Sequence, residues 1–465
     1  MLAKNLAKSA LLLSFCCLPL ATQASSVAVK ADHKLAAQQE KFSPAQLKED
    51  LQSLRAFIDA THPDISFSAS PTQLEQAYAA ISASLTQPMT ANQFWHQAGK
   101  LNPLFNDAHW SVNLPQDQTD MQQLIKKTGG VFPLEVHIRP DGELTVLALA
   151  GGADTPWRGA TIESINGVLA PLVGRQLLAL RHGDNPLNRA NLLGPSFQLY
   201  YASVFGAPAE FKLQLKQNDN ISEVTLPASQ TAAVIGKTSE KFADNFSYGV
   251  LDHNTAYLKL GTFSWPDEQE IGTFTKDAFT QIQQSGAKTL VIDIRENRGG
   301  NDSAWIDHVM PYLADRPFRV GSWNKKKVIA SRATATEPAG LVIESEFKTW
   351  YQPQLNNPLR FTGKVVVLTG RRTYSSAVQF SNVMQDFDFA TLAGEAAYAR
   401  ARSTGGIQFF TLPHSQLNII VPRFWSARPK GGFTEQLQTP DWLMPDDVTA
   451  PNALIQAVLA RSGAR

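Results

Sequence analysis

The sequence has very little cysteine and no excess of charge of either sign. Its two cysteines, Cys16 and Cys17, both lie close to the N-terminus, so the rest of the 465 residues offers neither a disulfide nor thiol chemistry. The formal net charge is +1, which gives no indication of a nucleic-acid partner. The nine histidines are scattered without metal-ligand spacing, so we expect no metal site and no cofactor.

Hydrophobic runs long enough to cross a membrane are also absent, so we expect no stable membrane insertion. Lys4 and Lys8 precede a short apolar run at residues 10–18, and the small-residue stretch Thr-Gln-Ala follows at residues 22–24. This order is typical of a signal peptide, which we place at residues 1–24. An exported chain without disulfides is typical of a bacterial periplasmic or secreted protein.

The chain is too long for one compact core, and its pattern changes twice. Residues 25–125 contain three helix starts, at Ser43, Ser70 and Thr90, each followed three residues later by glutamine. Residues 126–232 read as short strands and turns, and residues 233–465 alternate strands with helices. We therefore expect an α/β protein of several domains, with a helical cap domain first.

The most informative stretch is residues 364–387. An apolar run at residues 365–368 predicts a buried strand, and Gly370 breaks it before a helical pattern begins near Ala377. Ser375 and Ser376 lie at the start of this helix, where free N–H groups and the helix dipole can stabilise an oxyanion. Serine at this position can be a nucleophile or an ordinary helix cap.

Two other segments carry groups that could act with such a serine. His109 stands where a helix gives way to a strand, and its imidazole is either a half-buried structural group or a general base. Gly299 and Gly300 follow a buried strand directly, as an ordinary turn or as a loop whose N–H groups face a ligand.

Taken in order, these segments resemble the serine peptidases of family S41, the tail-specific or C-terminal processing proteases, and their tricorn-core relatives. The resemblance implies a core of the ClpP/crotonase type at residues 233–465, built of β-β-α units, and a PDZ-like domain at residues 126–232. The matching motifs lie at residues 106–110, 159–168, 292–300, 373–379 and 445–448.

The resemblance also assigns the catalytic groups. In the family the nucleophile lies three residues before a glutamate, and Gln379 takes that place, which selects Ser376 and leaves Ser375 as a neighbouring cap. Many members use a lysine base, but no lysine occurs between Ser376 and Lys430, and arginine cannot replace it. Tricorn-like members use a histidine from the earlier segment, which implies His109 as general base.

The remaining assignments follow from the same comparison. The N–H of Ala377 and that of Gly300 or Gly299 would form the oxyanion hole. Asp441 and Glu435 are the candidates to orient His109. Asp107, beside it in the sequence, is interpreted as structural.

These features predict an exported serine endopeptidase that cleaves peptides or proteins through an acyl-enzyme, with the PDZ-like domain binding a substrate C-terminus by strand addition. Gln379 and the segment 394–397 depart from the family pattern. The alternative is therefore a catalytically inactive protein that binds a peptide or small ligand on the same fold. Acyl-CoA chemistry on a crotonase-type core suits an exported chain poorly. The sequence leaves the substrate and the oligomeric state open.

Overall fold

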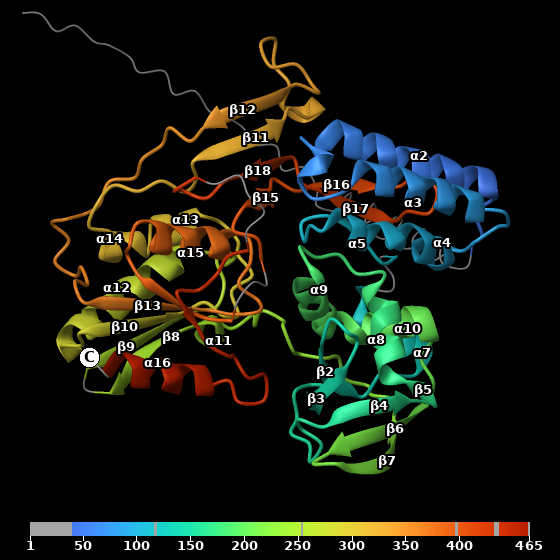
Figure 1. Ribbon diagram of the computed structural model, residues 1–465, viewed down its shortest axis with the longest axis horizontal. Coiled ribbons are helices and arrows are strands. Elements are labelled where there is room, and N and C mark those ends of the chain that lie inside the picture. The colour runs from blue at the N-terminus through green and yellow to red at the C-terminus, as the bar shows by residue number, and fades with distance from the viewer. Residues whose placement is uncertain (1–39, 116–118, 253, 396–398, 432–436, 464–465) are drawn as a thin grey trace, which may run out of the picture.

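The structure is a computed structural model that describes residues 40–115, 119–252, 254–395, 399–431 and 437–463. The predicted signal peptide, residues 1–24, lies outside these ranges. The expected mixed α/β fold of several domains is observed, with the N-terminal helices, a β-rich region and a strand-and-helix core side by side (Figure 1). No helix within the described ranges combines the length and apolar character needed to cross a membrane.

The N-terminal region consists of short helices that begin where the sequence predicted. Ser43 and Thr90 each form a capping box with the glutamine three residues later, and the Ser70 hydroxyl accepts a bond from the N–H of Gln73. Each cap satisfies N–H groups that have no partner inside the helix. The elements are α2 (Pro44–Thr61), η1 (Ile65–Phe67), α3 (Pro71–Ser84), α4 (Ala91–Ala98), η2 (Gly99–Leu101) and α5 (Asn102–Phe105).

The β-rich region contains an antiparallel sheet in the order β2-β3-β4-β6-β7, with β5 beside β4. Its elements are α7 (Met121–Thr128), β2 (Leu134–Ile138), β3 (Leu144–Leu149), β4 (Thr161–Ile165), β5 (Val168–Leu169), β6 (Glu210–Gln217) and β7 (Asn220–Pro227). Between β5 and β6 the chain forms helices that the sequence analysis did not predict. They are α8 (Ala170–Leu178), α9 (Pro186–Leu193), η3 (Gly194–Ser196) and α10 (Phe197–Phe205).

The core region is built on a six-stranded sheet in the order β19-β14-β13-β10-β9-β8. All pairs are parallel except β8 with β9. Side chains alternate between the two faces, so Val365 and Val367 pack with α12 and α15, while Val366 and Leu368 pack with α16. The strands are β8 (Phe246–Asp252), β9 (Thr255–Leu260), β10 (Thr289–Asp293), β13 (Lys364–Thr369), β14 (Thr391–Gly394) and β19 (Trp442–Leu443).

Helices cover both faces of this sheet, α16 on one side and the others opposite (Figure 1). They are α11 (Phe242–Asn245), α12 (Glu268–Ser285), α13 (Ser303–Ile306), α14 (Met310–Leu313), α15 (Ser376–Asp386) and α16 (Ala453–Gly463). A second, four-stranded sheet lies beyond α13 and α15 in the order β12-β11-β18-β15. It consists of β11 (Trp323–Lys327), β12 (Val342–Glu346), β15 (Ser403–Gly405) and β18 (Phe424–Ser426), with η4 (Ala330–Arg332) between β11 and β12.

A three-stranded sheet joins the N-terminal region to strands from the last quarter of the chain. In it β1 (Ser111–Val112) pairs with β17 (Asn418–Val421), which also pairs with β16 (Gln408–Thr411). Leu417 and Ile419 are buried in the same hydrophobic core as the N-terminal helices and the β-rich region. This pairing fixes the segment just before β1, which contains His109, against residues about 300 positions later in the sequence.

Candidate active site

Ser375 lies on a sharp turn between β13 and the first residue of α15. Its backbone has φ 53° and ψ −124°, a conformation that residues other than glycine rarely adopt. It occupies the N-cap position, but its side chain makes no cap hydrogen bond. The expectation that Ser375 serves as a helix cap is therefore wrong: the turn directs its hydroxyl elsewhere.

The hydroxyl meets His109. The Oγ atom of Ser375 lies 3.1 Å from Nε2 of His109. The imidazole is placed by the end of α5, where Asn106 adopts a left-handed conformation (φ 43°), and by β1, which begins two residues later. Inside β1, the N–H of Val112 donates to the buried side chain of Asn102 at 2.7 Å. The segment that carries His109 is thus held at both ends.

The other ring nitrogen determines the tautomer. Thr404 Oγ donates to Asp107 Oδ1 at 2.9 Å and lies 3.0 Å from His109 Nδ1. Because the threonine proton goes to the carboxylate, its oxygen accepts the proton on Nδ1. Nε2 then carries the lone pair and accepts the hydroxyl proton of Ser375. A chain of hydrogen bonds thus runs from Asp107 through Thr404 to His109 and leaves Nε2 as the proton acceptor.

Burial lowers the pKa of His109 below its usual value, and the nearby Asp184 carboxylate opposes part of this effect. The imidazole is therefore neutral near pH 7, which is the form that takes a proton. The pKa of Asp107 is raised, first by burial and then by Asp184. Asp107 also accepts the backbone N–H of His109 at 2.8 Å, so it positions both the backbone and the ring.

Asp184 ties the histidine segment to the serine turn. It comes from the loop between α8 and α9 and accepts the N–H of Ala108 at 2.8 Å and the hydroxyl of Tyr374 at 2.7 Å. The Tyr374 ring in turn lies beside that of His109, with centroids 5.0 Å apart. One carboxylate thus holds the residues that precede His109 and Ser375.

The structure does not bring the predicted pair His109 and Ser376 together. Ser376 is buried, with 1% of its surface exposed, and its hydroxyl donates to Asp302 Oδ1 at 2.5 Å. It also accepts the indole N–H of Trp305 at 3.0 Å. The side chain points into the core against α13, and it is Ser375, one residue earlier, whose hydroxyl contacts His109.

The predicted oxyanion donors differ in whether their N–H groups already have an acceptor. The N–H of Ala377 donates to the carbonyl of Tyr374 at 3.0 Å, and that of Gly299 donates to Asn297 Oδ1 at 2.8 Å. Both are therefore already used. Within the described residues the N–H groups of Gly300 and Ser376 have no acceptor, so of the predicted donors only Gly300 keeps a free N–H.

Asp441, one of the two predicted orienting carboxylates, does not contact His109. Asp441 accepts from Gln385 Nε2 and from the N–H of Leu392, both at 2.8 Å, and so joins the end of α15 to β14. Glu435 lies outside the described residues. Asp107, which we interpreted as purely structural, supports the imidazole through Thr404 instead.

The 292–300 motif supports the turn rather than the chemistry. The side-chain amide of Asn297 donates to the carbonyl of Leu260 at 2.9 Å, and its backbone carbonyl accepts the N–H of Tyr374 at 3.1 Å. Gly299 packs so closely that a Cβ there would lie 2.8 Å from Cβ of Ser375. Its φ of 93° also requires glycine. The loop after β10 thus shapes the serine turn.

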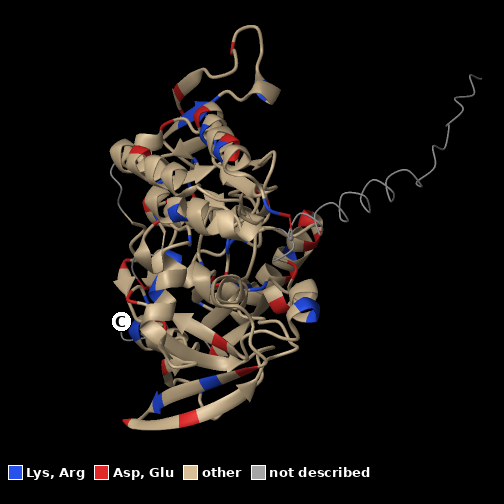
Figure 2. Ribbon diagram, turned by 90° about the vertical axis from the view of Figure 1, so that its right-hand side faces the viewer, with Lys and Arg blue, Asp and Glu red and all other residues tan. Residues whose placement is uncertain are grey.

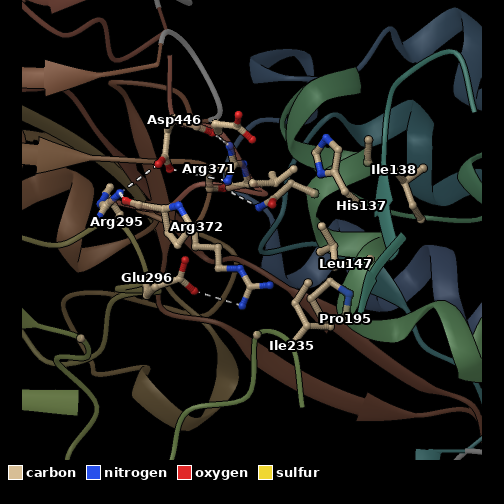
Figure 3. A pocket seen from close by; sticks show the side chains of 18 of the residues that line it. His137, Ile138, Leu147, Pro195, Ile235, Arg295, Glu296, Arg371, Arg372 and Asp446 are labelled. Carbon is tan, nitrogen blue, oxygen red and sulfur yellow. Dashed lines mark hydrogen bonds and ion pairs between the residues drawn. The ribbon is translucent and has the colours of Figure 1, made fainter. Parts of the chain in front are cut away.

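Ser375 and His109 open into a cavity of about 270 Å³. A neighbouring cavity of about 410 Å³ shares Asn191, Gly236, Arg371 and Arg372 with it. Figure 3 shows this neighbour between the core on one side and the β-rich region, represented by His137 and Pro195, on the other. The serine is therefore reached from a cleft between the two regions.

The part of the chain that the structure describes contains no group of three or more metal-ligating side chains. The site itself brings together the serine, the histidine and backbone donors. Thr404 escaped the sequence analysis, although it directly precedes the Gly405–Gly406 pair. A hydroxyl next to paired glycines has no local signature that would assign it to a histidine 295 positions away.

Comparisons with known proteins follow this geometry. Residues 254–442 match the family model described as peptidase family S41. A carboxyl-terminal-processing protease from a Picosynechococcus species is 25% identical over 197 residues, which are 41% of this chain. The match spans 41% of the length of that relative.

Solved structures show the same fold over most of the chain. The structure of mature CPAF complexed with lactacystin has a TM-score of 0.62 and 13% identity, covering 90% of this chain and 97% of that one. A second structure of mature CPAF has a TM-score of 0.61 and 12% identity, covering 89% and 96%. These structures show the shared fold, while the family match and the carboxyl-terminal-processing relative are what support serine-type peptidase activity. The predicted resemblance is confirmed: through residues 254–442 this chain is similar to the serine-type peptidases of family S41.

Proposed function

We propose that this protein is a serine peptidase whose nucleophile is Ser375 and whose general base is His109. One observation carries the proposal: the hydroxyl of Ser375 lies 3.1 Å from Nε2 of His109 on a turn with positive φ. Strained turns that expose a serine at the start of a helix are a recurring way to present a nucleophile. The S41 similarity of residues 254–442 supports the same chemistry.

The reaction follows from the positions of these groups. Oγ of Ser375 attacks the scissile carbonyl carbon while Nε2 of His109 accepts the hydroxyl proton. The proton then passes from Nε2 to the leaving amine as the C–N bond breaks, which leaves an acyl-enzyme. A water attacks that ester, giving its proton to Nε2, and Ser375 regains its proton as the product acid leaves.

The oxyanion of the tetrahedral intermediate is held by the N–H groups of Ser376 and Gly300. Ser376 directly follows the nucleophile and is the first residue of α15, where the helix dipole adds positive potential. Each such donor is typically worth about 3–4 kcal/mol of the barrier. The backbone of Ser376 would therefore serve the reaction while its side chain anchors the helix.

We further propose the arrangement implied by the resemblance. The protein is an exported endopeptidase, periplasmic or secreted, with a signal peptide at residues 1–24 and a helical cap domain at residues 25–125. Residues 126–232 form a PDZ-like domain that binds a substrate C-terminus, and residues 233–465 form a ClpP/crotonase-type core.

Cleavage of a mixed peptide library, followed by mass spectrometry, tests the activity. We expect Ser375→Ala and His109→Ala to lower the cleavage rate by roughly 10⁴-fold or more, as removal of a nucleophile or its base does. Ser376→Ala keeps the backbone N–H and should therefore lose far less activity than Ser375→Ala, and Ser222→Ala, an exposed serine in β7, is the neutral control. A folded wild type that cleaves nothing would instead favour the catalytically inactive binding protein.

A further inference from the structure

The cavity beside Ser375 is lined by positive charge. Four arginines face it, and no carboxylate of the described residues lines it. The four are Arg181, Arg298, Arg371 and Arg372. Over the whole molecule, in contrast, the net charge is +1, and acidic and basic residues are interspersed (Figure 2). The charge of this cavity is therefore a local feature.

Two of the arginines form no ion pair at contact distance within the described residues. Arg298 donates only to the carbonyl of Gly236, at 3.3 Å. Arg181 donates to the hydroxyl of Tyr200 at 3.0 Å and lies over its ring, 5.2 Å from the centroid. Its Nε–H is buried without an acceptor. Arg298 is exposed and Arg181 is half-buried, so both guanidinium groups can still pair with an anion that enters the cavity.

The other two arginines are compensated to different degrees. Arg371 contacts Asp446 and Glu395, each at 3.5 Å, and serves the structure. Arg372 lies 3.3 Å from Glu296, whose side chain is 59% exposed (Figure 3). A partner in contact with water neutralises it only in part. Arg372 therefore adds positive potential to that of Arg181 and Arg298.

Gly236 brings two of these groups together. Its carbonyl accepts from Arg298, and its Cα lies directly against the guanidinium of Arg372. A Cβ at this position would come within 2.2 Å of Arg372 Nη1, and the φ of 71° also disfavours other residues. The loop after β7 is thus built to let the two cations approach each other.

This approach is unfavourable without an anion. Burial lowers the pKa of Arg298, repulsion from Arg372 and Arg181 lowers it further, and the Glu296 carboxylate opposes part of this effect. A bound carboxylate would pair with the guanidinium and offset the repulsion between the arginines. The planar guanidinium matches a carboxylate through two parallel hydrogen bonds.

We propose that Arg298, Arg181 and Arg372 form a subsite that binds a carboxylate of the substrate next to the scissile bond. The inference rests on the proposed function, since it assigns a substrate class to the same site. The carboxylate belongs either to an aspartate or glutamate side chain or to the free C-terminus of the substrate. Both sources present the same group to the cavity, and peptides distinguish them.

Binding to the inactive Ser375→Ala protein tests the subsite without any turnover. The probes are pooled pentapeptides with an uncharged fluorophore, prepared in three forms: free C-terminus, amidated C-terminus, and amidated with one glutamate. A pool with glutamine in place of glutamate is the neutral reference. We expect at least about tenfold tighter binding of one carboxylate-bearing pool than of its neutral reference, as charge-assisted pairs typically give.

The arginine variants show where the carboxylate binds. Arg298→Gln in the Ser375→Ala background should abolish this preference and leave the neutral pools within about twofold, because only the charge-assisted contact is lost. Arg316→Gln is the matched control, since Arg316 pairs with Asp315 on the surface. The preference should also weaken between 50 and 500 mM salt, roughly as screened charge interactions do.

The outcomes separate the two proposals. Preference for the free C-terminus over its amide identifies the terminal carboxylate, and preference for glutamate over glutamine identifies a side chain. Equal binding of all pools, or an Arg298→Gln variant that weakens charged and neutral pools alike, overturns the subsite. Cleavage by the wild type, measured separately, decides the peptidase, so the subsite can fail while the peptidase stands, and the reverse.

Discussion

At the residue scale, two adjacent serines have opposite tasks. Ser375 is half-buried with a positive φ and contacts the imidazole, whereas Ser376 is 1% exposed and bonded to Asp302 and Trp305. Burial raises the pKa of Asp302, so its carboxylate depends on these two donors. The Ser376 side chain anchors the start of α15, and this anchor holds Ser375 in its strained turn.

Two substitutions should therefore change stability in opposite directions. Ser375→Gly removes the penalty of a positive φ and should stabilise the fold by about 1 kcal/mol. Ser376→Ala leaves the buried Asp302 with one donor fewer and should destabilise it by about 1–3 kcal/mol. Chemical denaturation of both variants measures the change in the free energy of unfolding. Changes of the same sign would contradict the view that Ser375 is strained and Ser376 is an anchor.

The pH dependence follows from the protonation states of His109 and Asp107. The base acts when neutral, so kcat/KM rises with pH through the lowered pKa of His109, below about 6.5. Ionised Asp107 accepts from Thr404 more strongly than its neutral form does, and its raised pKa adds a second deprotonation in the same direction. In the pH profile of kcat/KM, the acid side of the wild type should therefore be steeper than the titration of one proton allows. The profile of Asp107→Asn should fit the titration of a single group.

Thr404 is a positioning residue in this account. Thr404→Val removes the acceptor for Nδ1–H of His109 and should lower kcat on the order of 10²-fold, within the range of about 10²–10⁴ for an oriented base. KM should change little. Thr404→Ser keeps the hydroxyl and should restore most of the rate. A serine variant as slow as the valine variant would show that Thr404 acts only through packing.

At the scale of elements, the strand ends deliver the site. The turn after β13 carries Ser375, and the loop after β10 supports it through Asn297. Arg295 in that loop donates to Asp293 at 2.8 Å and to Asp446 at 2.9 Å, which ties the loop to the C-terminal tail. The three side chains are nearly buried. This ion triad fixes the loop that shapes the serine turn.

Removing the shared cation should be costly. Arg295→Met removes the guanidinium that Asp293 and Asp446 share, and we expect a loss of about 3–5 kcal/mol in the free energy of unfolding. Arg316→Met breaks an exposed pair with Asp315 and should cost less than about 1 kcal/mol. Urea denaturation of both variants compares them. Similar losses would show that the triad does not stabilise the loop.

Helix starts were predictable, but the register of the serine turn was not. The caps at Ser43, Ser70 and Thr90 follow from local hydrogen bonding, which the sequence records directly. The choice between Ser375 and Ser376 depends on one backbone φ, and on whether Trp305 and Asp302 take the second hydroxyl. Neither is written in the local pattern, so the family spacing from Gln379 selected the serine that does not contact His109.

At the scale of the whole molecule, the site is assembled from segments far apart in the sequence. His109 comes from the N-terminal region, Thr404 and Ser375 come from the core, and the pairing of β1 with β17 brings them together. The sequence predicted the involvement of His109 only through the order of motifs. It could not predict Thr404, because that contact depends on strand pairing across about 300 residues.

Breaking this pairing should inactivate the protein without unfolding the core. Ile420 lies in the central strand β17 and is paired with Ser111, so Ile420→Pro removes a ladder hydrogen bond and loosens the segment before β1. We expect peptidase activity to fall by roughly 10²-fold or more, since misplaced bases lose most of their effect. Circular dichroism should retain the helical signal.

Phe409→Thr is the matched control, because Phe409 lies on the neighbouring strand β16 with 69% of its surface exposed. This variant should keep the activity of the wild type. Equal loss in both variants would mean that the three-stranded sheet matters for folding and not for the position of His109.

The central claim is that Ser375 is the nucleophile. The most direct measurement is to react the protein with a fluorophosphonate and locate the adduct by peptide mass spectrometry, with His109→Ala in parallel. We expect the adduct on Ser375 and a strong reduction of labelling in His109→Ala. An adduct on Ser376, or labelling of Ser375 that does not depend on His109, would contradict the account.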